Sequence, residues 1–145
     1  SISLLDNLKS GLGISDQKER SLVQEVVDAY DIKTPDMDKA IKFLSGGNQQ
    51  KVIIGRSMYC NPKVLIFDEP TKGIDVGTKA EIYRLMKELA ENKGIGIILI
   101  SSEMEEIVKC SNRIIAIYAG RKVAEFDSGT DKDILLSSII GVKPE

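Results

Sequence analysis

Apolar residues in the first third of the chain recur every three or four positions, which is the spacing of an amphipathic helix. We expect Ser15 to cap this helix and Tyr30 to lie at its end. Its apolar stripe consists of Leu22, Val23, Val26, Val27 and Tyr30. The stripe is interpreted either as the core of a small helical lobe or as a surface that docks a membrane partner.

A turn separates this helix from a second one. Because Pro35 restricts Thr34 to extended geometry, residues 33–39 are expected to form that turn. The serine and two glycines at 45–47 are expected to start the second helix, which runs to about Tyr59.

From Lys63 onward the pattern changes to short continuous apolar runs, which are typical of strands buried on both faces. The runs at 64–67 and 95–100 predict two such strands, and residues 78–92 between them predict a helix. The apolar side of that helix, which we expect to be core, is formed by Ile82, Leu85, Met86 and Leu89.

The end of the chain adds a short helix, a hairpin and a closing helix. Ser102 and Glu105 predict a capping box for the short helix. Residues 113–126 predict a hairpin that turns near Ala119-Gly120, and residues 131–141 predict an amphipathic helix. Strands that alternate with helices indicate an α/β unit with parallel strands, and the helical first third is expected to form a separate lobe.

Composition narrows the function classes. A chain of 145 residues has the size of one ordinary domain, and its net charge of −2 does not favour a nucleic acid partner. No apolar run approaches the ~18 residues of a membrane span, and the first residues lack the pattern of a signal peptide. Cys60 and Cys110 lack the spacing of a metal or redox motif, so we expect reduced thiols in a cytoplasmic protein. The chain contains no histidine, the commonest general base.

Two consecutive acids follow the first buried strand. Asp68 and Glu69 are expected at the carboxyl edge of the sheet, where open α/β sheets bind ligands. One carboxylate could hold Mg²⁺, directly or through water, and the other could orient and deprotonate a water molecule. A solvated pair of acids at a strand end is the simpler alternative.

The turn "LSGG" at 44–47 carries a second signal. A helix that begins after Ser45 presents free N–H groups and the positive end of its dipole, which favours an anion such as phosphate. "LSGGNQQ", "VLIFDEPT" and "GID" follow one another between residues 44 and 75. In this order they resemble the signature motif, the Walker B strand and the D-loop of the ATPase subunit of an ABC transporter. The longer run is similar to the second half of the duplicated ATPases that drive monosaccharide import of the ribose and galactose type. The resemblance is dense over roughly residues 40–126 and loose before them.

The resemblance implies a role for each matching residue. Ser45, Gly46, Gly47 and Gln49 would contact the γ-phosphate of ATP held by a facing ATPase domain. Asp68 would serve Mg²⁺, Glu69 would position the hydrolytic water, and Asp75 would lie at the dimer seam.

The chain also departs from the family pattern. It contains no G-x-x-x-x-G-K-[ST] phosphate loop. The nearest match is "GIDVGTK" (73–79), but its lysine follows a threonine and not the glycine, and its spacing is short by one residue. The resemblance therefore implies an incomplete ABC-type P-loop NTPase core without the Walker A strand and loop. Its parts would be a helical signature subdomain (1–60), the carboxyl-terminal part of the ATPase core (61–126) and a terminal helix and tail (127–145).

Ser102 marks a second departure. The family usually has a histidine after the strand that follows the Walker B helix, and this strand ends in "LISSE". Serine can donate a hydrogen bond to a phosphate oxygen but cannot carry a proton as imidazole does. Ser102 is thus interpreted either as part of an altered catalytic site or as a helix cap only.

These observations favour a fragment of the ATP-hydrolysing subunit of an ABC sugar importer. The intact parent would use ATP and Mg²⁺, and its partners would be a facing ATPase domain, permease subunits and, indirectly, a sugar-binding protein. It would lie on the inner face of the cell membrane, and the fragment alone is expected neither to bind nor to hydrolyse ATP. Alternatives are a non-catalytic module that presents its signature turn to another domain's ATP, or an ABC-type ATPase of DNA repair or chromosome maintenance. The missing strand is expected to leave a gap or an unpaired sheet edge, and hence self-association or a rearranged strand pairing in that region.

Overall fold

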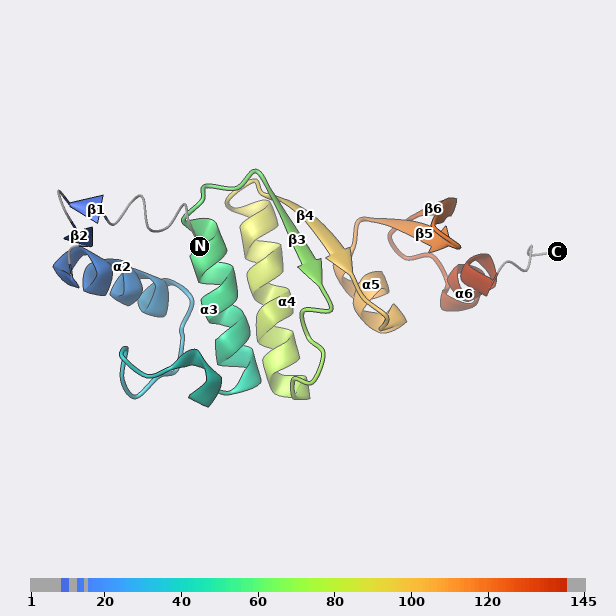
Figure 1. Ribbon diagram of the computed structural model, residues 1–145. Coiled ribbons are helices and arrows are strands. Elements are labelled where there is room, and N and C mark those ends of the chain that lie inside the picture. Colours follow the sequence, from blue (N-terminus) through green and yellow to red (C-terminus); the bar gives the residue numbers. More distant parts are fainter. Residues whose placement is uncertain (1–8, 11–12, 15, 141–145) are drawn as a thin grey trace. The chain divides into compact units, whose positions relative to one another are not determined.

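The computed structural model describes residues 9–10, 13–14 and 16–140, which form helices and short strands (Figure 1). In chain order the elements are β1 (Lys9–Ser10), β2 (Gly13–Ile14), α2 (Asp16–Ala29), η1 (Ile41–Phe43), α3 (Gly46–Met58), β3 (Val64–Asp68), α4 (Val76–Glu91), β4 (Gly96–Ile100), α5 (Met104–Cys110), β5 (Arg113–Tyr118), β6 (Arg121–Asp127) and α6 (Lys132–Ile140). The expected helix cap at Ser15 lies outside the described residues.

The chain divides into two compact units. The first contains the described residues up to 65 together with residues 70–97, and the second contains residues 66–69 and the described residues from 98 onward. The strands β3 and β4 contribute to both units.

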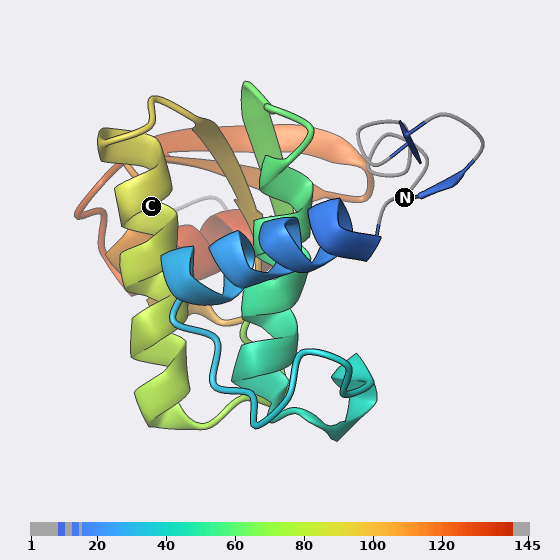
Figure 2. The ribbon, with the colours of Figure 1, turned by 90° about the vertical axis from the view of Figure 1, so that its left-hand side faces the viewer.

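The first unit contains α2, η1, α3 and α4, and α3 contacts the other three helices. Figure 2 shows α2 crossing α3. The crossing is close at Gly55, where an added Cβ atom would lie 2.4 Å from Val26 Cγ1 and 3.0 Å from Tyr30 Cδ2. Ile82, Met86 and Leu89 of α4 are buried, as predicted for the core stripe of this helix, and the fourth predicted residue, Leu85, is half-buried. The second unit buries Leu135 of α6 together with alternate residues of β5.

The two apolar strands pair in parallel. The Gly96 N–H donates to the Lys63 carbonyl at their start, and the Glu69 N–H donates to the Ile100 carbonyl at their end, each over 2.9 Å. The prediction that both faces are buried was wrong, since Val64 is 54% exposed and Ile66 65% exposed. Ile98 and Ile100 of β4 are about half exposed as well. Successive strand residues point to opposite faces, and the described residues cover one face of this pair only.

The hairpin forms as predicted. β5 and β6 pair antiparallel, with Tyr118 opposite Arg121, and the two turn residues Ala119 and Gly120 both have positive φ, as a type I′ turn requires. In the part of the chain that the structure describes, no ladder joins β4 to β5, and each strand pair forms its own two-stranded sheet. Among these residues β4 therefore has an unpaired edge, which is one of the two predicted outcomes.

Two predicted helix starts were wrong. The helix after the first strand begins at Val76, with Asp75 as its cap, and not at Thr78. The short helix α5 begins after Glu103, which makes no side-chain cap, so Ser102 does not form the expected capping box. The Ser101 hydroxyl accepts a hydrogen bond from the Glu103 N–H instead. The Ser102 N–H donates to the side chain of Glu69, the residue that follows β3.

Candidate functional site

The turn at Ser45–Gly47 is the first part of the candidate site. Ser45 is the cap residue of α3, and its Oγ accepts a 2.8 Å hydrogen bond from the Asn48 side-chain amide and a longer one from the Asn48 N–H. Because the helix begins at Gly46, the N–H groups of Gly46 and Gly47 have no acceptor within the helix. Ser45 and Gly46 are exposed whereas Gly47 is buried, so an anion at this turn would approach from the Ser45–Gly46 side.

The side chains of Asn48 and Gln49 stabilise this turn through hydrogen bonds to the backbone. The Asn48 Oδ1 accepts from the Lys33 N–H over 2.8 Å, which ties the turn to the segment before it. The Gln49 side chain donates to the Leu44 carbonyl over 2.9 Å. The sequence analysis assigned a ligand contact to Gln49 and did not identify Asn48, which lies three residues after the capping serine and donates to its Oγ.

Asp75 begins the neighbouring helix in the same unit. Its carboxylate accepts from the Thr78 N–H over 3.0 Å and from the Thr78 hydroxyl over 2.6 Å. The Thr78 hydroxyl and N–H lower the pKa of Asp75, so the carboxylate stays charged. The Cγ2 of Thr78 also contacts Gly47, where an added Cβ would approach it to 1.9 Å. The fold thus brings the Asp75 cap and the 45–47 turn onto neighbouring helix starts.

The acids after β3 differ in conformation. Asp68 is the last strand residue and is exposed, whereas Glu69 has a φ of +48°, a left-handed conformation that is costly for a residue with a Cβ atom. The Glu69 carboxylate accepts a 2.9 Å hydrogen bond from the Ser102 N–H. Glu69 and Ser102 are therefore adjacent, but through the backbone of Ser102 and not through its hydroxyl. Local strain of this kind is common at functional sites.

Asp68 and Glu69 offer the chemistry that a magnesium ion needs. A solvent-facing carboxylate at the end of a strand fits a hydrated Mg²⁺, which keeps several waters and takes one or two protein carboxylates. In the described residues, no group of three or more histidine, cysteine, aspartate or glutamate side chains is arranged to hold a metal by itself. The 45–47 turn and Asp75 belong to the first unit, and residues 66–69 and Ser102 belong to the second.

Lys51 is a buried cation near the candidate site in sequence. Its side chain is only 7% exposed. Its ammonium group lies 2.9 Å from the Glu81 carboxylate and donates to the Asp31 carbonyl over 3.0 Å. Lys51 therefore connects α3 to α4 and to the turn after α2.

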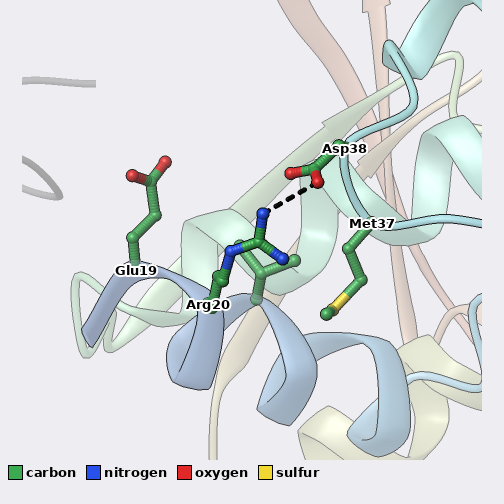
Figure 3. A pocket seen from close by; sticks show the side chains of 5 residues that line it. Glu19, Arg20, Met37 and Asp38 are labelled. Atoms are coloured by element: carbon green, nitrogen blue, oxygen red, sulfur yellow. Dashed lines mark hydrogen bonds and ion pairs between the residues drawn. The ribbon is translucent and has the colours of Figure 1, made fainter. Parts of the chain in front are cut away.

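A groove in the first unit is lined by other residues. It has a volume of about 250 Å³, and Figure 3 shows the Arg20 and Asp38 side chains paired across it over 2.9 Å. The other lining residues are Glu19, Val23 and Met37. It contains none of the predicted site residues. A search of the described helices finds none that is both long and apolar enough to cross a membrane.

Comparison with known proteins gives consistent results. The family model described as ABC transporter matches residues 2–72. The chain is 43% identical over 143 residues to a ribose import ATP-binding protein of Caldanaerobacter subterraneus subsp. tengcongensis, covering 97% of this chain and 29% of that protein. It is 49% identical over 119 residues to a xylose import ATP-binding protein of Photobacterium profundum, covering 82% of this chain and 23% of that protein. The chain therefore spans about a quarter of the length of these relatives.

Solved structures agree on the fold. A dimeric bacterial ABC transporter cassette is similar with a TM-score of 0.70 and 25% identity, covering 90% of this chain and 56% of that one. A second ATP-binding cassette of an ABC transporter gives a TM-score of 0.76 at 22% identity, covering 97% of this chain and 59% of that one. The α/β fold is thus that of part of an ABC ATPase cassette.

Proposed function

We propose a function on the premise that this chain belongs to the ABC transporter ATPase family. The chain is part of the ATP-hydrolysing subunit of an importer that couples ATP binding and hydrolysis to the uptake of a monosaccharide. The observation that carries this proposal is the 45–47 turn, whose free N–H groups start a helix packed against the start of the Asp75 helix. The similarity to ribose and xylose import ATP-binding proteins supports the substrate class.

Each site residue has a proposed task in the assembled subunit. The N–H groups of Gly46 and Gly47, with the Ser45 hydroxyl and Gln49, contact the γ-phosphate of ATP on a facing ATPase domain. Asp68 holds Mg²⁺ directly or through water, and Glu69 orients the attacking water. Asp75 lies at the seam between the two domains. Bound ATP and Mg²⁺ supply the phosphoryl group and its charge neutralisation, and the residues of this chain position and polarise them.

The proposed function also assigns roles to the segments of the chain and to its partner proteins. The helical part (1–60) signals to the permease subunits, residues 61–126 belong to the ATPase core, and 127–145 form a terminal helix and tail. A sugar-binding protein acts indirectly, and the subunit lies at the inner face of the membrane. Since these 145 residues contain no lysine-bearing phosphate loop, the isolated chain is expected not to bind or hydrolyse ATP.

A reconstituted transporter tests the proposal. The complete subunit carrying this chain is combined with its permease and sugar-binding protein, and ATP hydrolysis is measured with ribose, with xylose and without sugar. We expect sugar-stimulated hydrolysis that Ser45→Arg abolishes and that Asp68→Asn makes dependent on higher Mg²⁺. A rate of ATP hydrolysis that neither sugar changes and that Ser45→Arg leaves unchanged would contradict the proposal.

The non-catalytic module remains the second candidate, because Ser102 stands where the family usually has a histidine and bonds the Glu69 carboxylate through its backbone N–H. In that case the chain presents its turn to another domain's ATP while its own acids do not hydrolyse. Glu69→Gln separates the two possibilities. The variant halves or abolishes turnover if Glu69 acts, and leaves turnover unchanged if the chain only presents its turn.

A further inference from the structure

Thr78 contacts both parts of the candidate site in the first unit. Its hydroxyl donates to the Asp75 carboxylate over 2.6 Å, and its N–H donates to the same carboxylate over 3.0 Å. Its methyl group, Cγ2, lies where a side chain at position 47 would have to be, 1.9 Å from an ideal Cβ on Gly47. The hydroxyl and the methyl of one side chain thus reach the two neighbouring helix starts.

The contact at Gly47 explains why this position tolerates no side chain. The Cβ of Thr78 would lie 3.2 Å and its Oγ1 3.5 Å from a Cβ at position 47, so only the methyl group produces a severe clash. Gly46 is different, because a Cβ there would meet Ile74 only at 3.7 Å, an ordinary contact. The methyl of Thr78 therefore fixes how closely the buried Gly47 backbone approaches α4.

The hydroxyl has a separate effect. It donates a second hydrogen bond to the Asp75 carboxylate, in addition to the one from the Thr78 N–H, and so fixes the orientation of a side chain that is otherwise exposed. Among the standard residues only threonine carries both a hydroxyl and a methyl on one Cβ atom, since valine lacks the hydroxyl and serine lacks the methyl.

We propose that Thr78 is a positioning residue that holds the Gly47 backbone amide and the Asp75 carboxylate in fixed relation to each other. This inference rests on the proposed function, in which the Gly47 amide meets a phosphate and Asp75 meets the facing domain. In this proposal Thr78 contacts neither the phosphate nor the facing domain. It acts through Gly47 and Asp75, which do.

The two halves of Thr78 can be removed separately. Thr78→Val keeps a methyl against Gly47 and loses the hydrogen bond to Asp75, whereas Thr78→Ser keeps the hydroxyl and loses the methyl. In the complete subunit assembled with its permease, we expect Thr78→Ser to raise the KM for ATP about three- to tenfold with little change in kcat, because it loosens only the phosphate turn. Thr78→Val is expected to lower kcat about three- to tenfold with a smaller change in KM, since a hydrogen bond to a charged group is lost.

A rescue experiment tests the contact directly. Gly47→Ala is expected to lower kcat/KM more than tenfold, and Gly47→Ala combined with Thr78→Ser to recover most of that loss, because the clashing methyl is gone. Gly47→Ala combined with Thr78→Val is the matched control and should not recover. Urea unfolding of the same variants in the 145-residue chain should show the same order of midpoints, which reports on the contact without any ATPase activity.

The outcomes separate this inference from the function on which it rests. If the wild-type assembly shows no ATPase activity that depends on Ser45, the proposed function fails. If that activity is present but Thr78→Ser and Thr78→Val both leave KM and kcat unchanged, the positioning role is overturned. It is equally overturned if serine and valine at position 78 rescue Gly47→Ala to the same extent, or if only the unfolding midpoints respond while KM and kcat do not.

Discussion

A buried lysine at the centre of the first unit shows how single residues stabilise the fold. Lys51 is almost fully buried, and its charge is compensated by Glu81 on α4 and the carbonyl of Asp31. A buried ammonium group without such partners would be strongly destabilising. The pair therefore constrains where α4 can lie on α3.

Removing either partner of this pair should destabilise the chain. We expect Lys51→Met to lower the free energy of unfolding by about 1–3 kcal/mol, the cost of lost hydrogen bonds to a charged group. Glu81→Gln should cost at least as much, because it leaves the ammonium buried. Urea unfolding followed by circular dichroism measures both, and the double variant should cost less than the two single losses added together. Strictly additive losses would show that the two side chains do not interact, and Lys51→Arg is the control that keeps the charge.

The same pair should make stability depend on pH. The hydrogen bond and charge of Lys51 lower the pKa of Glu81 below its ordinary value of 4.5. A carboxyl group whose pKa is lower in the folded state stabilises the fold above its unfolded pKa and loses that contribution as the pH falls through its folded pKa. The stability difference between wild type and Glu81→Gln should therefore be constant from about pH 7 to 6 and shrink below about pH 4.5. Unfolding curves over this range check it, and a difference that grows on acidification would be inconsistent with the pair.

Local sequence could not identify the role of Lys51. Its partners lie 20 residues before it and 30 residues after it, and scattered cations on a helix are usually solvated. The 45–47 turn was predictable, because a capping serine and two glycines act over a few neighbouring residues. Glu69 shows the same limit, since its left-handed backbone and its bond to the Ser102 N–H depend on the neighbouring strand.

At the scale of elements, the crossing of α2 and α3 depends on one glycine. An alanine at position 55 would place a Cβ 2.4 Å from Val26 Cγ1. We expect Gly55→Ala to destabilise the chain by about 1–3 kcal/mol through overpacking, which outweighs the gain of about 1 kcal/mol in helix propensity. Chemical unfolding measures this loss, and adding Val26→Ala should recover part of it. Gly46→Ala is the matched control, because the added atom meets nothing closer than 3.7 Å. Equal stability of the Gly55 and Gly46 variants would refute the close crossing.

Most helices and strands were predictable from local patterns, but the residues at which they begin and the extent of their burial were not. The hairpin was found because its two-residue turn is a local signal, and α4 because its apolar stripe has the helical period. The start of α4 moved to Val76 since Asp75 can cap it through Thr78. The burial of β3 and β4 was overestimated, because an apolar run shows that a strand can be covered and not that the described residues cover it.

At the scale of the whole molecule, the separate sheets agree with the sequence. A chain that resembles an ATPase cassette but lacks the phosphate-loop segment was expected to contain a gap between its strands. The described residues form three two-stranded sheets with no ladder between β4 and β5. What local sequence could not predict is how much apolar surface this leaves on the outside, which includes Ile66, Ile98 and Ile115.

This apolar surface should make the 145-residue chain associate with itself. Ile66 is 65% exposed beside an unpaired strand edge, and such edges and patches pair with other chains when nothing covers them. We expect light scattering after size-exclusion chromatography to show a mass that rises with concentration, and Ile66→Lys to shift it toward the monomer. Phe43→Lys is the matched control, because Phe43 on η1 is 63% exposed and lies in no strand. A wild-type chain that stays monomeric at about 100 times the loading concentration, or an equal shift with both variants, would show that the strand surface does not drive association. If only Ile66→Lys weakens the association, the contact lies on the exposed face of β3.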